Sequence, residues 1–488
     1  MASTSEGAPA TRTSWPAARA AHASGTMGKR WDGEGKAVKS RRIFRASWSG
    51  VIPAHANFFQ WHPESRSSLA RLCIEKRFSL CPPEPSPVMV DAMRVLLTSA
   101  PMHGHILQLV PLSWALKAAG HEVLLTVPEG SVEVALAAGL PAVGNAEPVA
   151  MSEMIGRRRD GTPVPWPVSP EAKVRRSGRG FGRLAVRVIE GTLGIAERWR
   201  PDLVVSEPTE YAGRMVAARL GVPWVEHGWG LHPSPLYAEA AAAELAPELA
   251  AWRLPALPEP RLVLDVCPPR MQRPDPRAVP VRRMRYVPYN GSAPVPPWAL
   301  RPAARPRVCV TLGSVPAAGV PGLWAEVLTA MDRMDADVVL ATDPAQDLGP
   351  LPPTVRAVDW LPLTHVLPSC DLVVHHGGPG TTMTSLVHGL PQLVLAPLAS
   401  DMATYGRRVV ESGAGSTLPA SGATAARIET ECRRLLEDPR HRLGARALAE
   451  DIAQQPSPAL TVPSLVRVAH GDAPAAAEPE GEVRRCAG

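Results

Sequence analysis

The sequence predicts an α/β protein built from two doubly wound, Rossmann-like halves. Short apolar strands alternate with helical segments after Met93, and the same alternation starts again at Arg307. Such alternation favours parallel sheets with crossover helices. A proline-rich stretch, 291–306, separates the two alternations and is typical of a linker. Because such folds bind ligands at the carboxyl ends of their strands, we expect a cleft where the two halves face each other.

Composition limits the class of protein. The chain has 488 residues, 45% hydrophobic and 20% charged, which is enough for two domains with full cores. Residues 1–92 contain 13 basic and 7 acidic residues, and this difference of +6 equals the net charge of the whole chain. The remainder is near neutral, so we expect no nucleic-acid partner. No apolar run reaches 18 residues, so we expect no membrane span.

The two ends of the chain and its cysteines support further expectations. Residues 1–92 show no sustained periodicity and read as a disordered or spurious extension, with translation starting at or near Met93. The alternative is a basic tail that binds a partner. Residues 473–488 are rich in Ala, Glu and Pro and read as a disordered tail. The seven cysteines have no CxxC spacing, which favours reduced thiols in a cytoplasmic protein.

The residue pattern of the first half, 93–290, predicts alternating strands and helices, interrupted by one long loop at 151–180. The expected strands are 94–98, 121–127, 202–206 and 222–226. The expected helices end at Ala119 and Ala138 or span 182–199 and 209–220.

The second half, 307–472, repeats this pattern around one central strand, glycine turn and helix. The expected strands are 307–312, 336–341, 355–359, the run from Asp371, and 393–398. The expected helices are 322–334, 363–368, the segment after Gly380, 402–412 and 424–437.

The central turn is the most informative motif. The stretch Asp371–Pro397 reads DLVVHHGGPGTTMTSLVHGLPQLVLAP, with glycines between a buried strand and a helix start. Glycines allow a close backbone approach, and the free N–H groups of a helix N-terminus attract an anion. The histidines and threonines of the turn add donors. The spacing matches neither a P-loop nor GxGxxG, and no second ligand cluster supports zinc. The alternative is a tight βα turn without a ligand.

A histidine in the first half could act as a general base. His105 lies where the first strand meets the first helix, so a neutral imidazole there can accept a proton in the cleft. It could instead cap the helix, and His103 is a competitor for the role of base. A carboxylate would stabilise the imidazolium, and Glu207 and Glu210 both follow a strand at the same edge. Either acid could instead begin the next helix.

These motifs resemble those of a known family. HHGGPGTT, followed by GLPQLVLAP and Asp401, resembles the donor-diphosphate motif of GT-B nucleotide-sugar glycosyltransferases, in the bacterial natural-product subgroup of macrolide and anthracycline deoxysugar transferases. The segment PMHGHILQLVPLSWALKAAGHEV resembles that subgroup's acceptor-side loop and makes His105 the expected base. Gln108 departs from the family's usual proline. The resemblance covers about 93–470.

The resemblance implies a donor site in the second half. In the family, the serine after the first strand touches the diphosphate, and a tryptophan with the backbone after it forms the nucleobase site. Met402 replaces the usual glutamine after the aspartate, which favours a sugar with fewer hydroxyls. Read from the residues alone, Ser314 could be a turn residue and Trp360 a core residue. The implied donor-binding residues are Ser314, Trp360, Leu361, His375, Gly377, Gly378, Gly380, Thr381, Thr382 and Asp401.

The expected acceptor site lies in the first half. Trp224, His227 and Trp229 could flank a flat aglycone there or belong to the core.

Together, the motifs and the resemblance imply an inverting transfer of a deoxysugar from dTDP, or UDP, to a polyketide-type or other natural-product aglycone. His105 would be the base, and no metal or other cofactor is expected. Expected partners are the aglycone and the dTDP-sugar, with a cytochrome-like auxiliary protein and a homodimer as further possibilities. The competing functions are a nucleotide-sugar epimerase or hydrolase of the same fold, and a non-catalytic partner protein.

Overall fold

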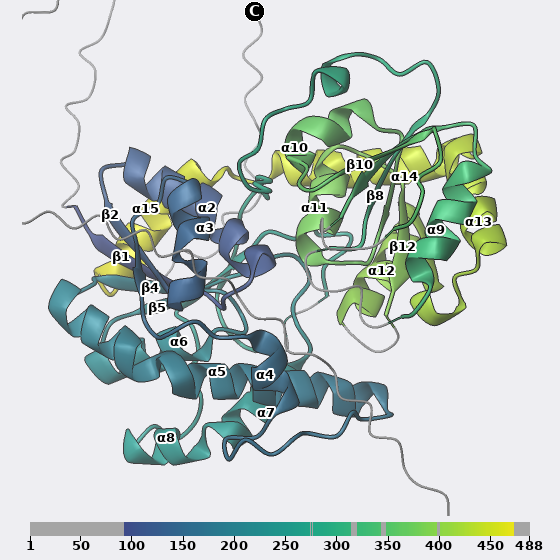
Figure 1. The fold of residues 1–488 in the computed structure, drawn as a ribbon. Helices are drawn as coiled ribbons and strands as arrows, with labels where there is room; N and C mark the ends of the chain where they lie inside the picture. The colour runs from purple at the N-terminus through teal and green to yellow at the C-terminus, as the bar shows by residue number, and fades with distance from the viewer. Residues whose placement is uncertain are drawn as a thin grey trace, which may run out of the picture. The chain divides into compact units, whose positions relative to one another are not determined.

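The computed structural model describes residues 92–273, 275, 277–313, 320–342, 348–397 and 401–472. The expectations for 1–91, for 473–488 and for Ser314 lie outside these residues. Within them the chain forms two sheets, each with helices packed against it (Figure 1). The α/β prediction with two Rossmann-like halves is confirmed. The expected domain boundaries stay predictions.

The first sheet has seven strands, all parallel, in the order β3-β2-β1-β4-β5-β6-β7. Its central strands are continuous apolar runs because helices cover both faces. The strands are β1 (Arg94–Thr98), β2 (Glu122–Val127), β3 (Ala142–Gly144), β4 (Leu203–Ser206), β5 (Trp224–His227), β6 (Leu262–Asp265) and β7 (Val281–Arg283). The helices are α2 (His103–Ala118), α3 (Val132–Ala137), α4 (Met151–Gly156), α5 (Pro170–Trp199), α6 (Tyr211–Leu220), α7 (Pro235–Glu244) and α8 (Ala246–Ala251).

The second sheet has six strands, also all parallel, in the order β10-β9-β8-β11-β12-β13. The strands are β8 (Arg307–Thr311), β9 (Asp337–Ala341), β10 (Val355–Val358), β11 (Leu372–His375), β12 (Gln392–Ala396) and β13 (Gly415–Pro419). The helices are α9 (Leu323–Asp332), α10 (Leu363–Val366), α11 (Pro379–Val387), α12 (Asp401–Glu411), α13 (Ala425–Glu437), α14 (Pro439–Gln454) and α15 (Pro458–Ala469). No helix in the described part of the chain is long and apolar enough to cross a membrane.

The strand order locates the sites. In each sheet the order of the strands reverses beside the first strand: successive strands are added on one side of β1 and then, from β4, on the other, and likewise at β8 and β11 in the second sheet. Ligands of open parallel sheets bind at this switch point, beyond the carboxyl ends of the strands. The segments that leave β1, β4, β8 and β11 are therefore the ones that can carry function.

The expectation of a loop over 151–180 was wrong for most of that segment. Residues 151–156 form α4, and α5 begins at Pro170, twelve residues before the expected helix start. Ser169 caps α5 by accepting a hydrogen bond from the N–H of Ala172 at 3.2 Å. Proline at the first helical position suits this start.

Three glycines in α5 explain the wrong prediction. Glycine is unfavourable inside helices, so Gly178, Gly180 and Gly182 weaken the helical signal. In the structure these positions give close contact with neighbouring helices. A Cβ on Gly178 would lie 2.6 Å from the carbonyl oxygen of Tyr237 in α7, and one on Gly180 would lie 2.5 Å from Cγ1 of Ile155 in α4. The close packing of α5 therefore requires glycine at these positions, although glycine has a low helix propensity.

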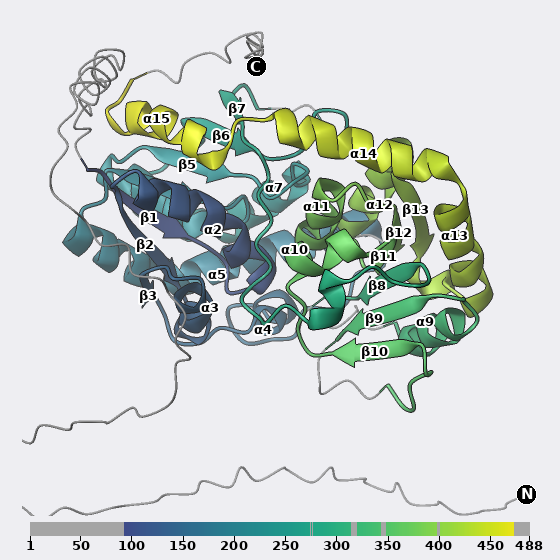
Figure 2. The same ribbon diagram turned by 90° about the horizontal axis from the view of Figure 1, so that it is seen from above.

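The last helix returns to the first sheet. Figure 2 shows α14 alongside the second sheet, and α15 packs against α2 and β4 of the first half. Leu465 of α15 and Leu109 of α2 are fully buried in one hydrophobic cluster. This cluster also includes Met383 of α11, so apolar contacts run through both halves.

Removing the anchor of α15 should destabilise the protein measurably. We expect Leu465→Ala to lower the free energy of unfolding by about 2–5 kcal/mol, because it leaves a cavity in the shared cluster. Leu460→Ala is the matched control, since Leu460 lies in the same helix but is 65% exposed. That control should change stability by at most about 0.5 kcal/mol. Equal losses in urea denaturation of the two variants would contradict the role given to α15.

Candidate active site

A histidine and a glutamate meet at the switch point of the first sheet. Strands β1 and β4 pair side by side, with Thr98 opposite Ser206 at their carboxyl ends. The segments after these strands therefore carry His105 and Glu207 to the same place. Nδ1 of His105 lies 2.9 Å from Oε1 of Glu207. The glutamate side chain is 1% exposed and the histidine side chain 16%.

Glu207 is held as an ionised carboxylate. Burial alone would raise the pKa of this carboxyl, but the charge and hydrogen bond of His105 and the N–H groups of Thr209 and Ala100 together lower it. Those N–H groups donate at 2.6 and 3.3 Å. When the imidazole is neutral, its hydrogen bond to an ionised carboxylate puts the single ring proton on Nδ1. The second ring nitrogen, Nε2, is then left as a proton acceptor.

Glu210 has a different role in the geometry. Its carboxylate caps α6 by accepting from the N–H groups of Ala212 at 3.0 Å and Gly213 at 2.8 Å, and the hydroxyl of Thr98 also donates to it. Burial raises the pKa of the Glu210 carboxyl. Of the two candidate acids, Glu207 is the one that contacts His105.

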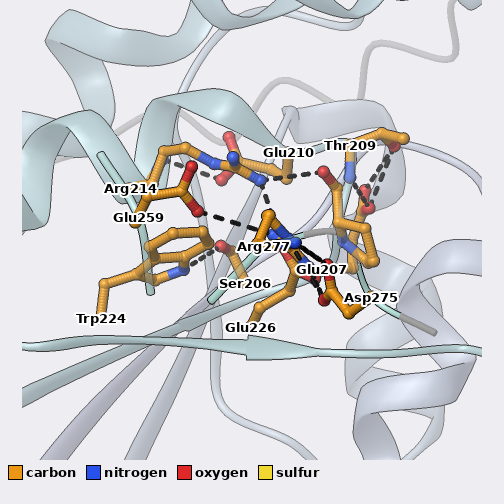
Figure 3. A network of polar contacts seen from close by, with 12 residues as sticks. Ser206, Glu207, Thr209, Glu210, Arg214, Trp224, Glu226, Glu259, Asp275 and Arg277 are labelled. Atoms are coloured by element: carbon orange, nitrogen blue, oxygen red, sulfur yellow. Dashed lines mark hydrogen bonds and ion pairs between the residues drawn. The ribbon is translucent and has the colours of Figure 1, made fainter. Parts of the chain in front are cut away.

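A buried ion network supports this edge of the sheet (Figure 3). Glu226 in β5 accepts two hydrogen bonds from Arg277, at 2.7 and 2.9 Å, and Arg277 also binds Asp275. Arg214 of α6 lies 3.6 Å from Glu226 and donates to the carbonyl of Pro208 at 2.9 Å. Buried charges need such pairing. The network fixes α6 and the end of β5 beside Glu207.

The three aromatic candidates for acceptor contact lie in different environments. The Trp229 ring meets the His105 ring edge-on, with centroids 4.5 Å apart. The Trp224 indole N–H donates to the Ser206 hydroxyl at 2.5 Å and its ring carries the guanidinium of Arg214, which places it in the core. His227 is also buried, and burial lowers its pKa to about 4. Of these three residues, Trp229 is the one whose ring contacts the imidazole of His105.

Sequence reasoning missed Phe181 as a second aromatic neighbour of His105. Its ring centroid lies 5.7 Å from that of His105. Phe181 belongs to α5, where the three glycines hide the helical period. The apolar spacing of Phe181, Leu184, Ala185 and Val188, all buried, is the signal that could have identified this face.

The central turn of the second half has the backbone geometry of an anion site. Gly377 has φ +90°, and a Cβ there would lie 2.8 Å from the carbonyl oxygen of Met402. Helix α11 then begins at Pro379 after its N-cap residue Gly378. The N–H groups of Gly380 and Thr381 donate to no carbonyl among the described residues. They are the unpaired groups that an anion would accept from.

The two histidines of this turn are placed differently. His375 is fully buried, with Nε2 2.8 Å from Oε1 of Gln392 and Nδ1 accepting from the Gly377 N–H at 3.1 Å. Both ring nitrogens of His375 are thus used in hydrogen bonds within the protein. His376 is partly exposed and lies against Gly378, where a Cβ would come 2.5 Å from its Nε2. Between the two, His376 is the ring nearer to the mouth of the turn.

The two threonines of the turn differ in burial. Thr382 is fully buried, and its hydroxyl donates to the carbonyl of Gly378 at 2.9 Å. Thr381 is partly exposed, so its hydroxyl remains accessible at the start of α11.

Trp360 presents an accessible ring at the other side of this site. It is 41% exposed, and its indole N–H donates to the carbonyl of Asn290 at 2.8 Å. The ring centroid of His103 lies 5.3 Å from that of Trp360. His103 therefore contacts Trp360, whereas His105 contacts Trp229. Leu361 is buried in a hydrophobic cluster, so only its backbone could face a ligand.

Asp401 begins α12 and reaches the first half of the chain. Its carboxyl receives a hydrogen bond from Tyr237 of α7. Burial raises the pKa of Asp401 to about 6, against the opposing charge of Arg273 and the bond from Tyr237. Tyr237 had no signal in the sequence, because its helix lies in a segment without a recognised motif. Among the described residues no group of three or more His, Cys, Asp or Glu is arranged to hold a metal ion.

Comparison with known proteins identifies the family of the chain. "Erythromycin biosynthesis protein CIII-like, N-terminal domain" matches residues 114–313, and the corresponding C-terminal domain matches 325–468. L-demethylnoviosyl transferase of Streptomyces niveus is 41% identical over 76% of this chain and 97% of its own. Elloramycin glycosyltransferase ElmGT of Streptomyces olivaceus is 38% identical, over 75% and 95%.

Solved structures share the fold. Glycosyltransferase SsfS6 of Streptomyces sp. SF2575, complexed with thymidine diphosphate, is 37% identical over 78% of this chain and 99% of its own, with a TM-score of 0.68. Spinosyn rhamnosyltransferase SpnG, complexed with spinosyn aglycone, is 30% identical over 76% and 100%, with a TM-score of 0.67. The chain is therefore an enzyme of the GT-B glycosyltransferase class. It belongs to the Erythromycin biosynthesis protein CIII-like family of bacterial natural-product glycosyltransferases.

The buried histidines should make the fold sensitive to acid. Burial, with a smaller contribution from His376, lowers the pKa of His375 from its ordinary value of 6.5 to about 3. Between these values the unfolded chain binds a proton that the folded chain does not. The stability contribution is therefore complete above pH 6.5 and is lost as the pH falls toward 3.

We expect His375→Gln to reduce the slope of unfolding free energy against pH between pH 6 and pH 4. The reduction should approach a tenfold change in the folding equilibrium constant for each pH unit. His470→Gln, at an exposed position of the same chain, should leave the slope unchanged. Urea denaturation at several pH values measures both. Parallel curves for wild type and His375→Gln would contradict the buried neutral imidazole.

Proposed function

We propose that the enzyme transfers a deoxysugar, with inversion, from a dTDP donor, or a UDP donor, to a polyketide-type or other natural-product aglycone, with His105 as general base. The observation that carries this proposal is the His105–Glu207 pair at the switch point of the first sheet. The carboxylate fixes the tautomer and orientation of the ring, so Nε2 is free to accept a proton. Trp229 and Phe181 provide apolar walls for a flat acceptor beside it.

The relatives support the donor and acceptor classes. Their names include desosaminyl, mycaminosyl and TDP-daunosamine transferases, of 32 to 34% identity. Solved relatives carry thymidine diphosphate or an aglycone. Small molecules of both kinds are therefore the expected partners of this chain. A cytochrome-like auxiliary protein and a homodimer stay predictions.

The proposed reaction is a single displacement. The acceptor hydroxyl oxygen forms a bond to the anomeric carbon while its proton passes to Nε2 of His105. The bond from the anomeric carbon to the diphosphate oxygen breaks, and its electron pair leaves with the diphosphate. The N–H groups of Gly380 and Thr381 at the start of α11 would stabilise that developing charge. Because this helix terminus supplies positive charge, we propose that the reaction needs no metal.

Asp401 and Met402 support a donor sugar with few hydroxyls. Asp401 can accept from one sugar hydroxyl in place of Tyr237. Met402 offers an apolar side chain at the position where the resemblance implies a glutamine amide. Without the amide, an extra sugar hydroxyl adds little binding free energy, and a deoxysugar that lacks this hydroxyl loses little.

The role of His105 can be tested directly. We expect His105→Ala to lower kcat by about 10²–10⁴-fold, because the acceptor hydroxyl loses its base. Binding of dTDP should stay unchanged, since His105 lies on the acceptor side. His103→Ala is the control: it removes the ring beside Trp360 and should raise the donor KM more than it lowers kcat. A His105→Ala enzyme with kcat within a few-fold of wild type would exclude the proposed base.

Donor preference tests the reading of Met402. We expect 6-deoxy or 2,6-dideoxy donors to react with higher kcat/KM than glucose donors. We expect Met402→Gln to shift the ratio toward glucose, because the amide restores hydrogen bonds to its hydroxyls. Competition assays with paired dTDP-sugars measure the ratio. Faster turnover of glucose donors by the wild-type enzyme would contradict the inference.

A further inference from the structure

A cavity lined by arginines lies along α5, away from the active site. Its volume is about 530 Å³, and its cationic lining comes from the segment after α4 and from α5, which Figure 1 shows with α4 and α7 at its sides. Arg176, Arg179 and Arg183 recur at three and four residues, which puts them on one face of the helix. Phe181, which contacts His105, points about half a turn away from that face. The lining arginines are Arg158, Arg159, Arg175, Arg176, Arg179 and Arg183.

The cavity carries uncompensated positive charge. Its lining includes two carboxylates, Asp160 and Glu244. Glu244 is shared between Arg183 at 2.9 Å and Arg159 at 3.1 Å. Arg175 pairs instead with acids of α5 and α7 outside the cavity.

The remaining three arginines form no ion pair with any described residue. They are Arg158, Arg176 and Arg179.

Two guanidinium groups have buried N–H groups without an acceptor. Arg183 is 6% exposed; its Nε donates to the carbonyl of Met154 at 2.6 Å and its Nη1 to Glu244, but its buried Nη2 has no partner among the described residues. The buried Nε of Arg176 also has none. Burial lowers the pKa of both groups, and Arg183 adds to the effect on Arg176. Buried donors of this kind are normally satisfied.

An aromatic ring borders the same cavity. The guanidinium carbon of Arg176 lies 4.4 Å from the centroid of Trp166, a cation–π contact. Trp166 is 72% exposed, so its fluorescence can report a ligand that binds Arg176.

We propose that this cavity is a binding site for a small phosphate-bearing anion. Glu244 is already paired, so three unpaired guanidinium groups and a free N–H of a fourth exceed what the remaining lining carboxylate, Asp160, can neutralise. Phosphate offers several acceptor oxygens and two negative charges in the geometry that guanidinium groups bind best. The source could be inorganic phosphate or pyrophosphate, or the phosphate of a nucleotide. The site is separate from the proposed donor site at α11 and goes beyond the proposed glycosyl transfer.

The test is calorimetric titration of inorganic pyrophosphate into the full-length protein at low ionic strength. We expect the double variant Arg176→Ala/Arg179→Ala to bind one equivalent fewer than wild type, or to bind it at least about tenfold more weakly. Neither side chain makes a described hydrogen bond that holds the fold, and a thermal denaturation midpoint near that of wild type checks folding. Arg187→Ala is the matched control, because Arg187 lies in the same helix in an exposed pair with Glu147 at 3.6 Å. This control should bind as wild type does.

A second arm identifies the source. If the site accepts nucleotides, dTDP should also lose one equivalent in the double variant; if it accepts only inorganic anions, dTDP should show the same stoichiometry in both proteins. Addition of pyrophosphate should change the emission of wild type more than that of Trp166→Phe, and the difference between the two should disappear in the Arg176→Ala/Arg179→Ala background. Wild type and double variant with equal pyrophosphate stoichiometry and affinity would overturn the proposal. His105→Ala should keep this equivalent, so failure of the proposed catalysis and failure of this site are distinguishable.

Discussion

A carboxylate buried beside a parallel sheet must be satisfied by hydrogen bonds, and His105 is one of the groups that satisfy Glu207, together with the N–H and hydroxyl of Thr209 and the N–H of Ala100. The glutamate is 1% exposed, and it accepts from an imidazole and from two backbone N–H groups. An unpaired carboxylate there would be strongly unfavourable. The same bond that stabilises the acid also fixes the ring of the histidine, so fold stability and the direction of Nε2 have one common cause.

The second half also buries a titratable side chain, in this case an imidazole that burial keeps neutral. His375 sits at the end of a buried strand, where a charged imidazole would be unfavourable, and it stays neutral between Gln392 and the N–H of Gly377. This pair of bonds shapes the turn that aims the first N–H groups of α11 outward. In the sequence the two adjacent histidines look equivalent, but one supports the turn and the other lies at its mouth.

Specific contacts tie the two halves together around the site. The hydroxyl of Tyr405 in α12 accepts from the N–H of Leu231 at 2.8 Å. The amide of Gln108, one turn after His105, lies so close to Gly380 that a Cβ there would be 2.9 Å from its Nε2. A proline, which the family resemblance implies at position 108, has no side-chain amide and could not make this contact. The helix that carries His105 is therefore in contact with the helix whose N-terminus would hold the diphosphate.

The sequence by itself determined the two alternating halves, the glycine turn before α11 and the position of His105 after the first strand, because these depend on local periodicity and on residues adjacent in the chain. Only the tertiary structure decided that Glu207 rather than Glu210 contacts His105, since that choice depends on the pairing of β1 with β4. The same holds for Trp224, whose environment depends on Ser206 and Arg214 from other elements. Helix α5 shows the limit most clearly: its glycines oppose helix formation locally, and contacts with α4 and α7, far away in the sequence, make the helix stable.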